Sequence, residues 1–255
     1  MEDINLQQGK KVYFASDNHL GAPNRKESLP SEKKFVAWLD SIKGDAQALF
    51  LMGDLFDFWF EYRTVVPKGF TRTLGKLAEL SDMGIQISYF VGNHDLWMDG
   101  YFEEELGIPV YHAPQQFHID GTSFFIGHGD GLGPKDKGFK RMKKVFTNPV
   151  AKWLFKWLHP DLGVRLGQHL SVNNKIISGE ADAKYLGEEG EWLILYAKRK
   201  LEARHYDHFI FGHRHLPLEV RLNERSTYVN LGDWISHCTY AVFDGEKLTL
   251  ETLGD

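Results

Sequence analysis

With 255 residues, 42% of them hydrophobic and 14% aromatic, the chain is long enough to bury a large core, and we expect one domain. Its net charge of −5 argues against a nucleic-acid binder that works by bulk positive charge, so no nucleic-acid partner is expected. The single cysteine excludes an intrachain disulfide, and no apolar run approaches the roughly 18 residues that cross a bilayer, so we expect a soluble, cytoplasmic protein.

Extended and helical patterns alternate in the first half of the chain. Short apolar runs predict three strands, at residues 11–17, 48–54 and 86–93. One helix is expected from the N-cap Ser31 to Gly44, and a second over residues 71–83 with Gly84 closing it. Strand, helix, strand, helix, strand is the order of an α/β sheet whose faces are covered by helices.

The second half brings strands that mostly lack a long helix between them. They are expected over residues 122–130, 208–213 and 226–232, followed by a hairpin over 239–252 that turns at Asp244 and Gly245. Because short connections join antiparallel neighbours, we expect this half to add antiparallel pairs.

Residues 133–204 break this rhythm, and we interpret them as a helical lid insertion within the single domain. The stretch contains no convincing strand, and prolines and glycines separate its helical patterns. Residues 135–156 hold eight lysine or arginine residues and one aspartate, a local charge of +7. Apolar side chains then fall on one helical face: Val150, Trp153, Leu154, Trp157 and Leu158. Such a helix either lies on an anionic membrane or grips an amphiphile, or its tryptophans pack on the domain.

Five polar motifs follow the predicted strands, namely SDNHLG, GDLFD, GNHD, GHGD and GHRH. Each places polar side chains just past the end of an apolar run, where neighbouring strands share an edge of the sheet. The side chains concerned are Asp17, His19, Asp54, Asn93, His94, His128, His213 and His215. Their convergence at one edge predicts a metal centre.

Aspartate and histidine ligands without cysteine suit Mn²⁺, Mg²⁺, Fe²⁺ or Zn²⁺, and among these we expect Mn²⁺. Two neighbouring ions need a shared carboxylate, for which Asp54 is the natural bridge. One ion would then take Asp17, His19 and one histidine of GHRH, and its neighbour would take Asn93, His128 and the other histidine. A water bound to such an ion has a lowered pKa, so a hydroxide would be available at neutral pH to attack phosphorus in line.

The five motifs, in this order, resemble the signature blocks of the calcineurin-like metallophosphoesterase superfamily and span residues 16–215. The resemblance implies one ion held by Asp17, His19, Asp54 and His215, and a second held by Asp54, Asn93, His128 and His213. It also implies a two-sheet α/β sandwich with the dimetal site at the strand ends.

Within that superfamily, the chain resembles the UDP-2,3-diacylglucosamine diphosphatases of lipid A synthesis. The resemblance rests on the chain length, on GDLFDFW with the acidic and aromatic residues after it, on GHGD, and on a helical insertion before GHRH. It implies an amphiphilic sugar-nucleotide substrate held between core and lid at the inner membrane surface, and cleavage to UMP and 2,3-diacylglucosamine 1-phosphate. The implied acyl contacts are Trp153, Trp157, Leu158 and Leu166, and the implied head-group contacts are Arg165, Asn174 and Lys175.

His94 departs from this branch, whose best-known members carry arginine in its place. A phosphate leaving group departs without much help from a proton, whereas an alkoxide needs a general acid. We therefore expect His94 to be the general acid, steered by Asp95, with Asn93 and His94 contacting the substrate. The histidine keeps soluble monoesters and diesters open as alternative substrates.

Other interpretations remain open beside this one. A non-catalytic scaffold on the same fold would be expected to lack metal ligands, whereas the motifs supply the full set. Asp57, Asp95 and Asp130 are expected to orient ligands rather than to bind metal. Trp59, Phe60 and Tyr62 are expected in the core rather than in a substrate pocket.

Overall fold

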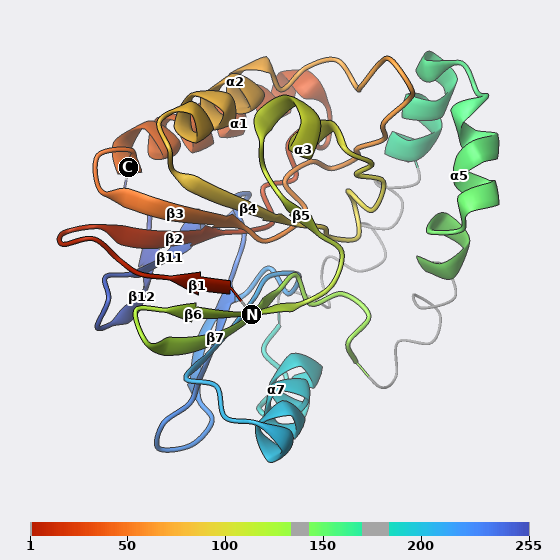
Figure 1. Ribbon diagram of the computed structural model, residues 1–255. Helices are drawn as coiled ribbons and strands as arrows, with labels where there is room; N and C mark the ends of the chain where they lie inside the picture. The colour runs from red at the N-terminus through yellow and green to blue at the C-terminus, as the bar shows by residue number, and fades with distance from the viewer. Residues whose placement is uncertain (1, 134–142, 170–183, 255) are drawn as a thin grey trace.

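The computed structural model describes residues 2–133, 143–169 and 184–254, and two stacked mixed sheets form its centre (Figure 1). One sheet runs in the order β12 (Leu248–Thr252), β11 (Thr239–Phe243), β2 (Lys11–Ala15), β3 (Ala46–Leu51), β4 (Gln86–Phe90) and β5 (Val110–Tyr111). The other runs in the order β1 (Glu2–Ile4), β6 (Gln115–Ile119), β7 (Thr122–Gly127), β8 (His208–Phe211), β10 (Thr227–Leu231) and β9 (Pro217–Arg221).

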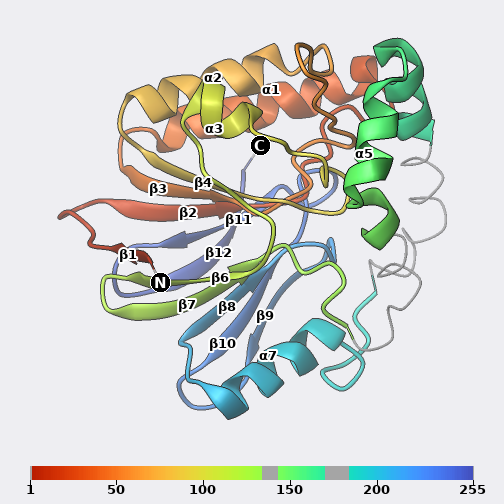
Figure 2. The same cartoon turned by 45° about the vertical axis from the view of Figure 1, so that its right-hand side comes forward.

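Helices cover the outer faces of both sheets, as Figure 2 shows. The first sheet carries α1 (Arg25–Ile42), α2 (Thr71–Asp82) and α3 (Tyr101–Leu106), and the second carries α7 (Trp192–Ala203). The apolar side chains of each helix pack on the sheet beneath it: Phe35, Trp38 and Leu77 on the first, and Leu193, Ile194 and Ala197 on the second. The predicted two-sheet α/β sandwich is therefore confirmed.

Aromatic side chains fill the space between the two sheets. The ring of Phe14 on β2 stacks on that of Phe50 on β3, with centroids 5.1 Å apart, and lies 6.0 Å from Phe124 on β7. All three are buried. Because large aromatic rings bury much apolar area, this layer fixes the separation of the sheets and with it the positions of their strand ends.

The helix expected to have Ser31 as its N-cap begins seven residues earlier. Asn24 is the N-cap of α1, and its side-chain oxygen accepts hydrogen bonds from the N–H groups of Lys26 and Glu27, both at 3.1 Å. Ser31 lies inside the helix, because the cap at Asn24 already satisfies the first-turn donors. The second helix is as expected, with Gly84 at φ +85° directly after its C-cap.

The expectation of antiparallel pairs in the second half is only partly right. β6 pairs antiparallel with β7, and β11 pairs antiparallel with β2 and β12. β8, however, is parallel to both β7 and β10. The connection from β7 to β8 includes α7, and such a helical crossover is what joins parallel neighbours.

The predicted insertion over 133–204 divides into two parts. α7, at its end, packs on the second sheet and belongs to the outer layer of the sandwich. Helical residues 143–146, α5 (Pro149–Lys156) and helical residues 160–169 lie instead beside the sandwich (Figures 1 and 2). The described residues of 133–204 contain no strand, and none of the helices described anywhere in the chain has the length and apolar character to cross a membrane.

Candidate metal centre

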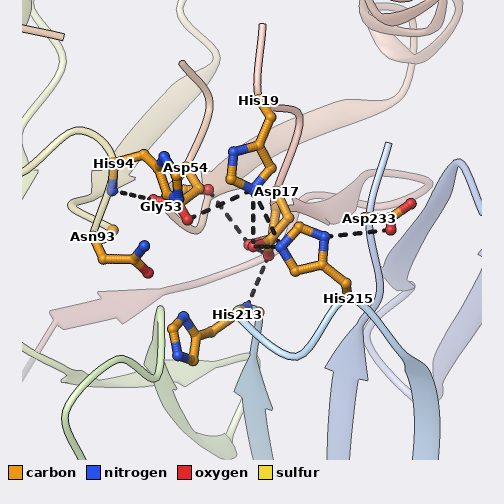
Figure 3. Close-up of polar contacts among 12 residues, drawn as sticks. Asp17, His19, Gly53, Asp54, Asn93, His94, His213, His215 and Asp233 are labelled. Carbon is orange, nitrogen blue, oxygen red and sulfur yellow. Dashed lines mark hydrogen bonds and ion pairs between the residues drawn. The ribbon is translucent and has the colours of Figure 1, made fainter. Parts of the chain in front are cut away.

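The side chains of all five motifs lie at one end of the sandwich. Asp17 and His19 follow β2, Asp54 follows β3, and the pair Asn93 and His94 follows β4. From the other sheet, His128 follows β7, and His213 and His215 follow β8. Figure 3 shows Asp17, His19, Asp54 and His215 pointing toward one another. The convergence predicted from the strand ends is thus present.

Left-handed backbone conformations aim these side chains. Five of the predicted ligands have a positive φ, between 45° and 69°: Asp17, His19, Asp54, His213 and His215. Residues other than glycine seldom adopt this region, and it persists where surrounding bonds hold it. Here Asp17 N donates to Gly53 O at 3.1 Å and His19 N donates to Asp54 O at 2.9 Å. The turns are therefore fixed by the backbone before any ion binds.

Two motif glycines let the carboxylates approach the chain closely. A Cβ atom at Gly92 would lie 2.2 Å from Asp54 Oδ1, and one at Gly212 would lie 2.4 Å from Asp17 Oδ2. Any larger residue would therefore push the carboxylate away. The glycines of GNHD and GHRH serve the geometry of the site.

One cluster joins Asp17, His19 and His215. Asp17 Oδ1 lies 3.4 Å from His215 Nε2 and 3.8 Å from His19 Nε2, and the two Nε2 atoms are 3.2 Å apart. Asp17 Oδ1 is buried and accepts no hydrogen bond from the described residues. A buried oxygen without a donor, facing two imidazole nitrogens, fits a divalent cation.

A second cluster centres on Asp54. Its Oδ2 lies 3.4 Å from His128 Nε2 and 3.7 Å from His19 Nε2, so one oxygen faces both clusters. Asn93 Oδ1 is 3.2 Å from His128 Nε2, and the ring of His213 lies 5.1 Å from that of His128. All seven predicted ligands thus surround the same space, with Asp54 between the two groups.

Two of the predicted ligand histidines, His128 and His215, contact the protein through their other ring nitrogen, Nδ1. His128 Nδ1 donates to Met52 O at 2.8 Å, and His215 Nδ1 lies 3.4 Å from Asp233 Oδ2. Such contacts orient the opposite nitrogen toward a metal and raise its basicity. Asp233 was missed in the sequence, although GDW after a strand has the same form as GDLFD.

Charge within the cluster agrees with cation binding. Burial alone would raise the pKa of Asp54, but His128, His94 and His19 outweigh it and hold the pKa well below its ordinary value. Burial opposes the charge on His128, yet Asp54 raises the pKa of this imidazole to about 10. The carboxylate is therefore ionised at neutral pH, and divalent ions at these nitrogens would replace histidine protons as its counter-charge.

The position of His94 agrees with the prediction, but that of Asp95 does not. His94 N donates to Asp54 Oδ1 at 2.8 Å, and its ring meets that of His19 with centroids 4.7 Å apart. The carboxylate expected to steer His94 instead accepts hydrogen bonds from the main chain of Gly92 at 2.7 Å and Leu55 at 3.1 Å, and from the Tyr89 hydroxyl. Asp95 therefore stabilises the GNHD turn and its contact with the neighbouring GDLFD turn.

Asp57 contacts His94 where Asp95 was expected. Its carbonyl oxygen lies 3.0 Å from His94 Nδ1, and its Oδ1 lies 3.7 Å from the same nitrogen and 3.5 Å from His19 Nδ1. Asp57 was expected to orient ligands, and its contacts agree with that role. Asp130 instead pairs with Lys143 at 2.5 Å and ties the insertion to the GHGD loop.

A buried ion pair, not foreseen from the sequence, anchors the GHRH motif. Arg214 lies between the predicted ligands His213 and His215, and its guanidinium donates to both carboxylate oxygens of Glu191 at 2.9 and 3.0 Å. The same group donates to Lys184 O at 3.0 Å. Both charged residues are buried, so this bidentate pair connects the end of the insertion to the metal-ligand turn.

The insertion residues predicted to bind substrate take different positions. Trp153 and Trp157 are 57% and 75% exposed and lie against each other, with centroids 5.8 Å apart, so they do not pack on the domain. Phe155 fills that role against Phe60 and Trp97. Leu158 and Leu166 are exposed as well, and Asn174 and Lys175 lie outside the described residues. Trp59 and Phe60 are core residues as expected, and Tyr62 is partly buried against the same cluster.

A cavity of about 570 Å³ joins Asp57 to the insertion. Arg165, predicted to contact the head group, lines it together with Arg25 and Lys68. Apolar side chains form much of its wall: Leu20, Phe58, Val65, Val66, Phe70 and Val164. The cavity therefore combines apolar surface and positive charge beside the metal-ligand cluster.

Comparison with known proteins decides the family. Residues 10–217 match the calcineurin-like phosphoesterases. The chain belongs to this family. A UDP-2,3-diacylglucosamine hydrolase of Porphyromonas gingivalis is 41% identical in sequence to this chain. The alignment covers 96% of this chain and 98% of the relative. One of Shewanella baltica is 25% identical, over 95% and 97%. The protein is thus a metal-dependent phosphoesterase, as the motifs predicted.

Proposed function

We propose that this phosphoesterase hydrolyses the pyrophosphate of UDP-2,3-diacylglucosamine to UMP and 2,3-diacylglucosamine 1-phosphate, using two divalent ions, with Mn²⁺ as the expected metal. The observation that carries the proposal is the position of Asp54 Oδ2, within 3.4 Å of His128 and 3.7 Å of His19. One oxygen that faces two ligand groups is the arrangement that a two-metal phosphoryl-transfer site requires. The name of the Porphyromonas gingivalis relative supports the choice of substrate.

The residues around the ions would position the substrate and the proton. Two bound ions would supply Lewis acidity to the phosphoryl oxygens and to the attacking water. The carbonyl of Asp57 can only accept, so His94 Nδ1 donates to it at 3.0 Å and the ring is held in one orientation. A protonated His94 would then interact with the leaving phosphate, and Asn93 would contact the substrate from the same turn.

The insertion would hold the acylated end of the substrate at the inner membrane surface. The cavity between Asp57 and the insertion has the apolar wall that acyl chains require. On the outside, four apolar residues of α5 and its C-terminal end are exposed, at 57% to 75%: Val150, Trp153, Leu154 and Trp157. Lys152 comes from the same helix, as does Lys156, which pairs with Asp99 at 2.5 Å. Apolar side chains flanked by lysines favour an anionic lipid surface, so we propose peripheral membrane association.

The assay for this function is release of UMP from UDP-2,3-diacylglucosamine by purified protein with Mn²⁺. We expect turnover that EDTA abolishes and that Mn²⁺ restores. The absence of UMP from an intact, Mn²⁺-loaded protein would refute the proposed substrate.

Hydrolysis of soluble diesters is a second candidate, favoured by the position of His94. Its main-chain N–H donates to Asp54 and its ring contacts His19, so a side chain that can serve as a general acid lies beside the predicted ligands. If this candidate is correct, kcat/KM for a soluble nucleotide diester will exceed that for the lipid substrate, and His94→Ala will abolish the diester reaction. The opposite order of kcat/KM would support the lipid substrate.

A further inference from the structure

A second cavity, of about 440 Å³, opens on the other side of the metal-ligand cluster. His128 lines it together with Gly129 and Asp130 of the GHGD motif. It shares no lining residue with the cavity at Asp57. The two cavities therefore reach the cluster from different ends, one at His128 and one at Asp57, which contacts His94 and His19.

The walls of the two cavities differ in chemistry. The cavity at Asp57 is lined largely by aliphatic and phenylalanine side chains. The cavity at His128 has apolar residues in its wall too, such as Phe90 and Leu132, but it adds the rings of Tyr111 and His112 and the lysines Lys143 and Lys144. Aromatic and imidazole rings beside lysines are typical of sites for a planar ligand that carries negative charge.

Tyr111 provides a fixed ring in the wall of the second cavity. Its ring stacks on Phe90 with centroids 5.1 Å apart and 29° between the planes, and its hydroxyl donates to Glu2 at 2.5 Å. Contacts on the ring and on the hydroxyl leave the side chain little freedom to move. A rigid aromatic wall costs little conformational entropy when a base packs beside it.

The positive charge of this cavity is available to a ligand. Asp130 offsets Lys143, with 2.5 Å between Oδ2 and Nζ. Lys144 is exposed and has no ion-pair partner among the residues that the structure describes. Lys144 therefore gives the cavity, which His128 also lines, a cation that no described carboxylate offsets.

We propose that the second cavity holds the nucleoside monophosphate half of the substrate, while the cavity at Asp57 holds the acylated sugar phosphate. This inference rests on the proposed function, because only a substrate with two unlike halves fills both cavities. It also agrees with the position of His94, whose ring contacts Asp57 in the wall of the first cavity.

The hydrolysis can be written with this placement. The oxygen of water forms a bond to the phosphorus of the nucleotide half, at the His128 side, as the bond from that phosphorus to the bridging oxygen breaks. The bridging oxygen and its electron pair leave with the sugar phosphate toward His94. The protons of the attacking water pass to the phosphate products and to solvent, and UMP remains in the second cavity until it dissociates.

Product inhibition by UMP tests the placement. In Mn²⁺-loaded protein we expect Lys144→Ala to weaken inhibition by UMP about tenfold or more, the usual effect of one lost charged hydrogen bond. His112→Ala should weaken it less, and inhibition by the lipid monophosphate should stay unchanged in both. The matched control is Lys68→Ala in the other cavity, which should leave UMP inhibition unchanged. Lys144 and His112 are exposed, so both variants should fold.

Unchanged UMP inhibition in both Lys144→Ala and His112→Ala, or a weaker one in Lys68→Ala, would overturn the placement. Calorimetric titration with UMP separates this result from a failure of the proposed function. If the protein cleaves only soluble esters but still binds UMP through Lys144, the nucleotide cavity stands and the lipid substrate does not. If it releases UMP from the lipid substrate but binds it without Lys144, the lipid substrate stands and the nucleotide cavity does not.

Discussion

Two regions of the molecule differ in how far their side chains are exposed. They are the turns with the predicted metal ligands and the helix α5 of the insertion. In the turns, Asp17 and Asp54 are 0% and 1% exposed, and the protein holds them by backbone bonds. On α5, Trp153 is 57% exposed, and Trp157, just beyond it, is 75% exposed. The turns bury their polar side chains in fixed positions, whereas α5 presents an apolar face that no described residue covers.

This difference teaches where each function resides. Chemistry at phosphorus needs groups fixed before the substrate arrives, because reorganisation during the reaction would raise the barrier. Capture of an amphiphile needs apolar surface that is free until the ligand or the membrane covers it. Variants in the two regions should therefore fail in different assays.

The largest effect is expected from Asp54→Asn. Loss of the bridging carboxylate removes a ligand from both ion sites, and we expect kcat to fall by about 10³-fold or more. Asp120→Asn is the matched control, because Asp120 also has a positive φ, of 49°, but is exposed in the turn between β6 and β7. Activity of Asp54→Asn within tenfold of the wild type would exclude a bridging role.

Next in size is the effect of Arg214→Ala on stability. The change leaves Glu191 as a buried charge without its guanidinium, and we expect the free energy of unfolding in denaturant to fall by about 3–5 kcal/mol. In the Arg214→Ala and Glu191→Ala double variant the loss should be smaller than the sum of the single losses. Additive losses would show that the pair does not couple the insertion to the GHRH turn.

A smaller effect is expected from Asp233→Asn, which should lower the affinity for Mn²⁺ by about 10-fold to 100-fold because His215 loses its carboxylate partner. Asp244→Asn is a close control, since Asp244 and Asp233 both accept hydrogen bonds from the main chain of a turn, but Asp244 contacts no ligand histidine. Calorimetric titration of the metal-free protein gives both affinities. Equal affinities for Mn²⁺ in the two variants would show that Asp233 does not contribute to metal binding.

The smallest change is expected from the double variant Trp153→Ser and Trp157→Ser. It should weaken binding to anionic vesicles by about tenfold or more, because each serine transfers less apolar area to the lipid than the indole that it replaces. Stability and turnover of a soluble diester should stay unchanged. Phe155→Ser provides the contrast, because Phe155 packs on Phe60 and Trp97 and its loss should destabilise the fold. Unchanged vesicle binding by the double variant would exclude α5 as the membrane contact.

The same two regions differ in how far the sequence predicts them. The ligands Asp17, Asp54 and His128 were predictable because each follows an apolar run, and strand ends of one sheet share an edge. The presence of the helix α1 was predicted, but its N-cap at Asn24 was not, because a cap is a single local hydrogen-bond choice.

Contacts between distant segments could not be read from the chain. Arg214 and Glu191 are 23 residues apart and no periodicity links them. The contact of His94 with Asp57 rather than Asp95 depends on how two turns pack, since Asp95 is the nearer in sequence. Whether the tryptophans of the insertion face the domain or solvent was undecided for the same reason, because one apolar stripe fits either packing.

Anomalous diffraction from crystals grown with Mn²⁺ tests the two-ion site most directly. We predict two peaks, about 3.5 to 4 Å apart, with a carboxylate oxygen of Asp54 between them. One peak should lie against Asp17, His19 and His215, and the other against Asn93, His128 and His213. A single peak, or no peak at these side chains in protein that still hydrolyses its substrate, would contradict a two-metal mechanism.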